Sequence, residues 1–421
     1  MRLFWNHVWA IALVLGVTPW LCSCNLLGLK SHISKMEQHG SVIVQVSPPP
    51  NGAAPTYAAA WTTTEDGNVE SAGFQRLRAD GFASFSLLTN RTYCVGAFTD
   101  ENGNGDYDPG EPAGYVAEVH PTAFGDAAAR TKLLKFALTR TNSLPPDTII
   151  EVPKGNRSPG VVLEVAMGDI ASLDDARFSS DTGTVGLWRP FDFLNQNATG
   201  IYFTEPYDPK RIPVIFVYGI GGSPQDWKYI MDHFDRSRYQ LWFFHYPSGM
   251  RLSRVARALA AGLEILKERH GFTQCDIVAH SMGGLVSYLA IHEVVTDEHA
   301  DFFPKFVTIS TPWGGHQAAA LGVRYLNKPV PSWIDVAPKS DFLESLYANP
   351  LPQKTGHELI YGEIPSAPGV PGKDDGVVTV ESELGPPIGK NALSVAHFPY
   401  GHVAILNQPQ TLKQVLEFLD K

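Results

Sequence analysis

The pattern of apolar and polar positions changes near residue 160 of this 421-residue chain. Before that point the apolar runs are short, they are separated by turn-forming residues, and no helical period is sustained. Short runs of this kind are typical of β-strands. They predict strands over residues 41–46, 57–61, 82–88, 93–98 and 133–138. The segment 41–140 is therefore predicted to be a small all-β sandwich.

Beyond residue 160, apolar runs alternate with helical patterns. Between residues 252 and 270 one apolar stripe repeats at spacings of three and four, and Gly271 follows as a stop signal. Strands are expected at residues 161–167, 200–204, 214–218, 241–244, 276–279, 306–309, 358–361 and 392–396, and further helices after residue 283 and at residues 412–419. Such alternation predicts an α/β fold in which helices cover both faces of a mostly parallel sheet.

Two polar segments are predicted to be linkers. Residues 24–40 show no clear period, and residues 141–159 are rich in proline and polar residues. With residues 1–23 set aside as a targeting segment, the expected order is a linker at 24–40, a sandwich at 41–140, a linker at 141–159 and an α/β domain at 160–421. The length of the chain is ample for two hydrophobic cores.

The amino-terminal segment has the features of an export signal. Arg2 precedes an apolar run over residues 8–17, which is too short to span a bilayer comfortably, and Ser23 and Cys24 follow. The segment resembles a bacterial lipoprotein signal, which implies cleavage before Cys24 and lipidation of its thiol. By the same resemblance, Asn25 favours the outer membrane over the inner. The alternatives are an ordinary secretory signal and an uncleaved anchor.

The charge of the chain limits its possible partners, and its cysteine content indicates the state of its thiols. The net charge of −10, the pI near 5.8 and the lack of a Lys/Arg cluster argue against nucleic acid as a partner. If Cys24 carries lipid, only Cys94, Cys275 and the signal's own Cys22 remain. Cys94 and Cys275 lie in different predicted domains, so we expect both thiols to be free.

One loop of the predicted sandwich has the spacing of a calcium loop. Oxygen ligands at positions 1, 3 and 5, a glycine at 6 and a carboxylate at 12 define that spacing. The candidate ligands are Asp100, Asn102, Asn104, Asp106, Asp108 and Glu111. The loop resembles the calcium loops of bacterial prealbumin-like or Cna-B-like sandwiches, and a structural calcium ion is the cofactor that this resemblance implies. The alternative is a solvated turn that holds no metal, because Asp, Asn and Gly favour turns by themselves.

The strongest chemical signal is the hexapeptide Ala279-His280-Ser281-Met282-Gly283-Gly284, which lies between a predicted strand and a predicted helix. A nucleophile elbow has this form, because its tight turn admits only small residues two positions before and after the serine. Ser281 is therefore a candidate nucleophile. In isolation such a short match also fits an ordinary strand-to-helix turn.

A second signal is the glycine-rich loop that follows the strand at residues 214–218. Residues 212–227 read I-P-V-I-F-V-Y-G-I-G-G-S-P-Q-D-W. Glycines let backbone N–H groups approach a substrate carbonyl and stabilise a developing oxyanion. The alternative, a phosphate-binding loop, lacks the Gly-Lys-Ser/Thr ending and the G-x-G-x-x-G frame.

Together these motifs give residues 160–421 a resemblance to α/β-hydrolases of the lipase and esterase kind with an alanine-containing elbow. The resemblance implies oxyanion donors at the amides of Ile220 and Met282. It also implies a catalytic acid at Asp375, directly before Gly376, and a catalytic base at His402. Asp374 is the alternative acid.

The sequence thus predicts an exported, lipid-anchored serine hydrolase that cleaves carboxylic esters and needs no cofactor for catalysis. Its expected partners are an ester or lipid substrate and a membrane that holds the lipid anchor. Residues 316–352 are a candidate lid. The alternatives are an acyltransferase or lipid deacylase with the same triad, and an inactive cell-surface binding protein on the same fold.

Overall fold

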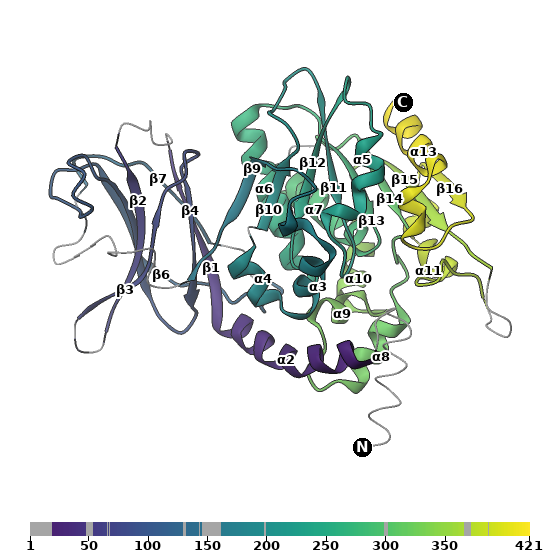
Figure 1. Cartoon of the computed structure of the whole chain (residues 1–421), viewed down its shortest axis with the longest axis horizontal. Helices are drawn as coiled ribbons and strands as arrows, with labels where there is room; N and C mark the ends of the chain where they lie inside the picture. The colour runs from purple at the N-terminus through teal and green to yellow at the C-terminus, as the bar shows by residue number, and fades with distance from the viewer. Residues whose placement is uncertain are drawn as a thin grey trace. The chain divides into compact units, whose positions relative to one another are not determined.

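The computed structural model describes residues 19–47, 54–64, 66, 68–128, 132–142, 144, 161–197, 199–298, 302–365, 372–385 and 387–421 (Figure 1). The chain divides into two compact units. One comprises residues 1–33, 166–193 and 199–421, and we call it the hydrolase unit. The other, the sandwich unit, comprises residues 34–165 and 194–198.

The sandwich unit contains two four-stranded sheets. One sheet has the order β7-β1-β4-β8 and the other β3-β2-β5-β6. Their strands are β1 (His39–Val46), β2 (Thr56–Thr63), β3 (Val69–Arg76), β4 (Phe82–Leu88), β5 (Tyr93–Thr99), β6 (Ala113–Val119), β7 (Lys132–Phe136) and β8 (Val161–Val162). The pairing of β1 with β7 is parallel, and every other pairing is antiparallel.

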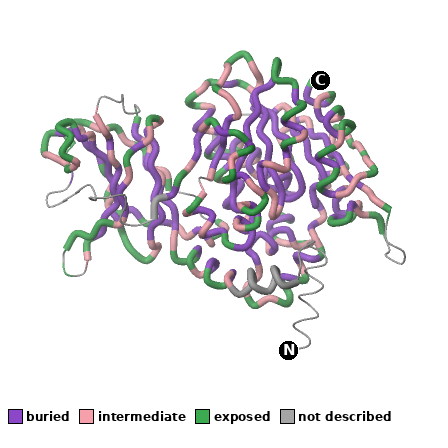
Figure 2. Tube along the Cα trace, viewed as in Figure 1, coloured by how far each residue is buried: buried purple, intermediate pink, exposed green. Residues whose placement is uncertain are grey.

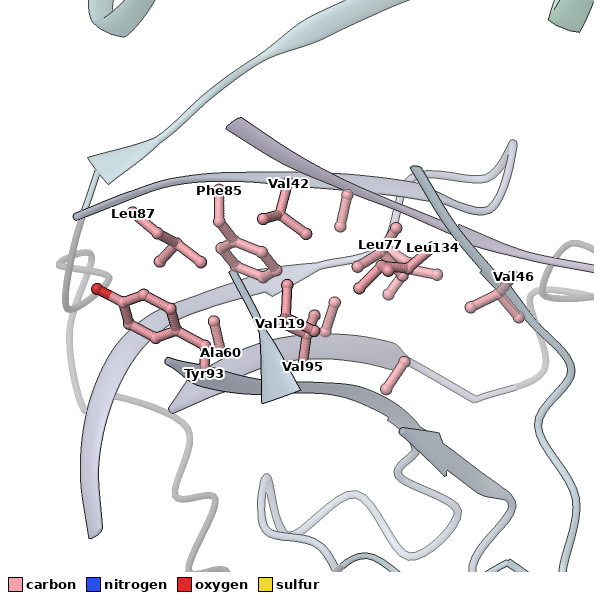
Figure 3. Close-up of a cluster of buried hydrophobic side chains, with 14 residues drawn as sticks. Val42, Val46, Ala60, Leu77, Phe85, Leu87, Tyr93, Val95, Val119 and Leu134 are labelled. Atoms are coloured by element: carbon pink, nitrogen blue, oxygen red, sulfur yellow. The ribbon is translucent and has the colours of Figure 1, made fainter. Parts of the chain in front are cut away.

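The apolar faces of the two sheets share one core (Figure 3). Val42 and Phe85 come from one sheet, Ala60 and Val95 from the other, and all four are buried. β3 and β6 were not predicted, because they carry exposed polar side chains in place of an apolar run. The sequences of β3 and β6 lack an apolar run, and hydrogen bonding to β2 and β5 stabilises them as strands.

The hydrolase unit is built on an eight-stranded sheet of order β16-β15-β14-β13-β11-β12-β10-β9. Its strands are β9 (Val165–Ile170), β10 (Thr199–Phe203), β11 (Ile212–Val217), β12 (Tyr239–His245), β13 (Asp276–His280), β14 (Lys305–Ile309), β15 (Gly356–Gly362) and β16 (Ser394–Phe398). Neighbouring strands from β16 to β12 pair in parallel, and β10 is antiparallel to β12.

Helices cover this sheet. α6 (Leu252–His270) packs against β10 and α7 (Met282–Glu298), and α13 (Pro409–Leu419) packs against β14 and β16. α6 ends where its sequence predicts, at Gly271, whose φ of 69° suits glycine. β12 and β13 are buried along their whole length, as expected of strands covered on both faces (Figure 2). This topology is the α/β-hydrolase fold, and the predicted fold class is confirmed.

Several helices lie where the sequence pattern predicts none. The expected linker at 24–40 is largely helical, since α2 (Pro19–Gln38) covers it. The reason is an apolar spacing that the polar composition hides: Leu29, Ile33 and Met36 are buried on one side of the helix. The other α-helices of the described residues are α3 (Ser180–Trp188), α4 (Pro190–Gln196), α5 (Lys228–Asp232), α8 (Gln317–Tyr325), α9 (Pro331–Val336), α10 (Asp341–Ala348), α11 (Val380–Glu383) and α12 (Ile388–Asn391).

Two expectations fall wholly or partly outside the described residues. These are the apolar run at 8–17 and most of the linker at 141–159. The expected cleavage point before Cys24 lies within α2. In the part of the chain that the structure describes, no helix combines the length and apolarity needed to cross a bilayer.

Candidate active site

Ser281 lies at a tight turn between β13, which ends at His280, and α7, which begins at Met282. Its φ of 53° places it in the left-handed region, which is uncommon for a residue with a side chain. The amide of Ser281 donates to the carbonyl of Ile309 at 2.8 Å, and its own carbonyl accepts from the amide of Gly284 at 3.0 Å. These hydrogen bonds to the adjacent strand and helix thus hold the strained turn in place.

Two glycines make the turn sterically feasible. A Cβ atom at Gly283 would lie 2.4 Å from the carbonyl oxygen of Val217 on the adjacent strand. A Cβ atom at Gly219 would lie 2.6 Å from the Cβ of Ser281. Both contacts are too close for any side chain. The glycines of the elbow and of the loop after β11 are therefore required by close packing around Ser281.

His402 and Asp375 join Ser281 in one chain of hydrogen bonds. Nε2 of His402 lies 2.9 Å from Oγ of Ser281, and Nδ1 of His402 lies 2.5 Å from Oδ2 of Asp375. All three side chains are buried. They come from three loops at the carboxyl ends of β13, β15 and β16, where active sites of open α/β sheets lie.

The geometry separates the two candidate acids. The Oδ1 of Asp374 accepts the amide of Gly376 at 2.8 Å, within its own turn, whereas the carboxylate of Asp375 contacts His402. The other oxygen of Asp375, Oδ1, accepts the amides of Val377 at 2.9 Å and Val378 at 2.7 Å. Burial acts to raise the pKa of Asp375, but the hydrogen bond and charge of His402, together with these two amides, hold the pKa below its ordinary value. Asp375 is therefore the ionised partner of His402.

The two predicted oxyanion donors come from different elements: Ile220 lies in the loop after β11, and Met282 directly follows Ser281 in the elbow. Ile220 and Met282 both line the pocket into which Ser281 opens. Met282 is the first residue of α7, so its amide has no acceptor within the helix. The amide of Gly221 donates to Oγ of Ser248 at 2.9 Å, which ties the loop to the segment after β12.

Tyr218, directly after β11, has a structural role. Its hydroxyl donates to the carbonyl of Tyr246 and accepts the amide of the same residue at 2.8 Å. The hydroxyl of Tyr246 donates in return to the carbonyl of Tyr218. The two rings stack with their centroids 4.5 Å apart. This reciprocal pair joins the ends of β11 and β12 directly beside the glycine-rich loop.

His280 supports the site in a way that the sequence did not reveal. Its Nε2 lies 2.9 Å from the carbonyl oxygen of His402, so this nitrogen must carry the hydrogen and donate. Burial, reinforced by the nearby His402, lowers the pKa of His280 to about 3. His280 is thus a neutral donor that helps to hold the His402 loop. A single histidine in a sequence carries no signal of its partner, so this role becomes visible only in the fold.

An apolar pocket opens at Ser281. Its total free volume, including the part open to solvent, is about 520 Å³. Helices α8 and α9, within the expected lid, supply one wall through Ala318, Ala319 and Trp333. Trp333 packs edge-on against Trp188, with the ring centroids 5.7 Å apart. His316 also lines the pocket, and its Nε2 donates to the carbonyl of Val377 at 2.8 Å.

The predicted calcium ligands of the sandwich unit lie in one turn that is held by its own hydrogen bonds. The buried carboxylate of Asp100 accepts the amides of Gly103 and Gly105. The carboxylate of Asp108 accepts both side-chain amides of Asn102 and Asn104 at 2.7 Å. Glu111 accepts the amides of residues 101 and 108, and the amide of Asp106 donates to Asn104. In the described ranges no group of three or more His, Cys, Asp and Glu side chains is arranged to hold a metal ion.

The chain is similar to several known proteins over part of its length. Residues 209–335 match a family model described as "Putative serine esterase (DUF676)". A search of curated proteins found no match. Among solved structures, the chain is similar to the lin2722 gene product of Listeria innocua, with 18% identity over 50% of this chain and 94% of that one and a TM-score of 0.39. It is also similar to the mature lipase BlEst2 of Bacillus licheniformis, with 20% identity over 52% and 97% and a TM-score of 0.43.

The matched segment begins before β11 and ends within α9. It contains the glycine-rich loop, the elbow and Ser281, whereas Asp375 and His402 lie beyond it. Over residues 209–335 this chain is therefore similar to a family of serine esterases, and the unit that contains these residues has the α/β-hydrolase fold.

Proposed function

We propose that the protein is a serine hydrolase that cleaves carboxylic esters through an acyl-enzyme. The observation that carries the proposal is the continuous hydrogen-bond chain from Ser281 through His402 to Asp375 at the mouth of an apolar pocket. A binding protein that had lost activity would have no need of a strained, buried serine held in this chain.

In the first half-reaction, Oγ of Ser281 attacks the ester carbonyl carbon while its proton moves to Nε2 of His402. The amides of Ile220 and Met282 stabilise the oxyanion that forms. The intermediate collapses, the bond to the alcohol oxygen breaks, and His402 gives the proton to the leaving alcohol. Asp375 stays ionised and stabilises the imidazolium. Water then attacks the acyl-enzyme by the same steps, which releases the acid and restores Ser281.

The pocket supports an apolar acyl group as the part of the substrate that is bound. Ala318 and Ala319 leave space on α8, whereas the indole of Trp333 occupies space on α9. Each methylene that enters such a pocket contributes about 0.8 kcal/mol. The rate constant kcat/KM should therefore rise with chain length until the pocket is filled.

A chain-length series of p-nitrophenyl esters tests this proposal. Trp333→Ala should move the optimum to longer acyl chains, and Ala319→Leu should move it to shorter ones. The same reactions with a long-chain alcohol present distinguish water from another acceptor. Preferred transfer to the alcohol would assign the protein to acyltransferases, and turnover of amide or phospholipid substrates alone would point to a deacylase.

We also propose that the protein is exported and anchored by lipid at Cys24, at the outer membrane of a bacterium. The support is the sequence: Arg2, the apolar run at 8–17 and the small Ser23 directly before the cysteine. Cys24→Ala should abolish incorporation of labelled palmitate, and Cys22→Ala is the matched control that should keep it. Equal labelling of both variants would rule out Cys24 as the site.

A structural calcium ion in the loop at 100–111 is a further proposal. The loop's oxygen donors, which are carboxylates and amide carbonyls, are of the type that calcium prefers. The ion would support the sandwich unit and would take no part in the hydrolytic steps.

A further inference from the structure

A second carboxyl group is buried beside the proposed triad, and the mechanism above does not use it. Glu383 is the last residue of α11, and, like Asp375, it is 1% exposed. Its Oε1 accepts the amide of Gly362, at the end of β15, at 3.3 Å. Its Oε2 is buried and has no hydrogen-bond donor in suitable geometry among the described residues.

The surrounding backbone keeps Glu383 in this place. Its amide donates to the carbonyl of Thr379 at 2.9 Å, which closes the turn of α11 that begins four residues after Asp375. The hydroxyl of Ser382 donates to the carbonyl of Gly315 at 2.6 Å, and the amide of Gly314 donates to the carbonyl of Ser382 at 2.8 Å. α11 is therefore anchored from both sides of Ser382, and Glu383 faces the interior.

Asp375 and Glu383 share one small buried space. A Cβ atom at Gly362, whose amide contacts Glu383, would lie 3.1 Å from the Cβ of Asp375. The side chains of Glu383 and Asp375 are within hydrogen-bonding reach, and the Ser310 hydroxyl also faces Glu383. Two carboxylates cannot both stay ionised side by side in a buried site, so one of them holds a proton.

The proton belongs to Glu383. Asp375 receives hydrogen bonds from two amides and faces the cation that forms on His402, so it is the group that stays ionised. Burial, followed by the negative charge of Asp375, raises the pKa of Glu383 to about 9, while Ser310 and the Gly362 amide act in the opposite direction. At neutral pH Glu383 is thus a neutral carboxylic acid with one hydrogen to donate.

We propose that Glu383 is a positioning residue that donates its carboxyl hydrogen to Asp375 and so holds that carboxylate in line with His402. The inference rests on the proposed function, since it assigns Glu383 a role in the same triad. Ionisation of Glu383 removes the donated hydrogen and places a second negative charge against Asp375. The triad therefore loses its alignment when Glu383 loses its proton.

The test measures the pH dependence of the rate constant for labelling of Ser281 by a fluorophosphonate, which needs the triad but no natural substrate. In the wild-type protein the rate should fall with a midpoint near pH 9. Glu383→Gln keeps a neutral donor of the same shape and should lack this fall. The decrease in labelling rate at acidic pH should be the same as in the wild type, because the substitution replaces one neutral group with another. Glu358→Gln, a second buried glutamate on β15 that contacts Ser394 and Gln414, is the matched control and should keep the wild-type profile.

Superimposable profiles for Glu383→Gln and the wild type would overturn the proposal. The proposal would also be overturned if the midpoint of the decrease in labelling rate at acidic pH lay about one pH unit lower in Glu383→Gln than in the wild type. Such a shift would mean that the wild-type carboxyl is ionised at neutral pH. If Glu383→Gln does not fold, carbon-13 spectra of the wild-type protein with labelled glutamate carboxyls give the answer. A glutamate that titrates near pH 9 supports the proposal, and titration of every glutamate below neutral pH overturns it.

A complete lack of labelling in the wild-type protein would instead reject the proposed serine hydrolase activity. The carbon-13 titration would still report the protonation of Glu383 in that case. The two failures are therefore distinguishable.

Discussion

The hydrolase unit and the sandwich unit each contain a loop for which the sequence predicts a function, catalysis in the first and calcium binding in the second. The two loops are built differently. Ser281 sits at a left-handed backbone position, and its surroundings leave no space for a Cβ atom at Gly219 or Gly283. In the sandwich loop, Gly103 and Gly110 also have positive φ values, but a Cβ atom there would meet nothing within 4 Å. The elbow glycines are thus constrained by packing, and Gly103 and Gly110 only by their backbone conformation.

The difference extends to the polar groups. In the elbow, the hydroxyl of Ser281 points to a histidine from a loop 121 residues away along the chain. In the sandwich loop, the polar side chains mostly bond to amides within the same twelve residues. Local hydrogen bonds explain the composition of a turn without any ligand, whereas the contact between Ser281 and His402 forms only because the fold brings two distant loops together.

The largest effect on activity is expected from a substitution of Asp375, the proposed catalytic acid. Asp375→Asn should lower kcat/KM for a p-nitrophenyl ester by about 10⁴, as the same change does in the serine-protease triad, because the amide favours the wrong tautomer of His402. Asp374→Asn is the matched control, since the side chain of Asp374 accepts the amide of Gly376 within its own turn. Equal losses in the two variants would mean that the adjacent acids act through the stability of the loop.

A smaller effect is expected from calcium in the sandwich unit. An ion bound only by the folded state at a concentration of 100 Kd adds about 2.7 kcal/mol to the free energy of unfolding. Calcium should therefore raise the Tm of the full chain relative to EDTA, as followed by calorimetry. Asp108→Asn, which removes one carboxylate ligand, should reduce the shift. A Tm that is identical in calcium and EDTA would leave the loop as a metal-free turn.

A glycine of the elbow and a glycine of the sandwich loop should respond differently to replacement by alanine, because only the first is tightly packed. Gly283→Ala should lower the free energy of unfolding by about 1–3 kcal/mol through overpacking, and should slow fluorophosphonate labelling because Val217 and the elbow must move apart. Gly110→Ala should cost about 1 kcal/mol from backbone strain alone and leave labelling unchanged. Chemical denaturation and labelling rates of both variants check this. If labelling slowed equally in both, packing at the elbow would not be what distinguishes the loops.

Much of the hydrolase fold could be predicted because its signals are local. The stripe of leucines in α6, its stop at Gly271 and the buried apolar strands all follow from nearest neighbours along the chain. Helix α2 could not be predicted as readily, because its apolar residues Leu29, Ile33 and Met36 are separated by polar ones and gain their burial from tertiary packing. Strands β3 and β6 were missed for the same reason.

The site divides in a similar way. Ser281, Asp375 and His402 each have a glycine within two positions in the sequence, and the structure brings these three residues together. The sequence predicts no role for His280 or Glu383. Their roles depend on partners from loops 122 and 21 residues away, on the His402 carbonyl and the Gly362 amide. Only the folded chain shows these contacts.

The most direct test of the account is the identification of the residue that reacts with a fluorophosphonate. The account predicts that mass spectrometry of the labelled wild-type protein finds the adduct on Ser281, because His402 activates that hydroxyl alone. It also predicts that Ser281→Ala, with an unchanged circular dichroism spectrum, takes up no label and hydrolyses no ester. Labelling or ester hydrolysis that persists in folded Ser281→Ala would contradict the assignment of the nucleophile.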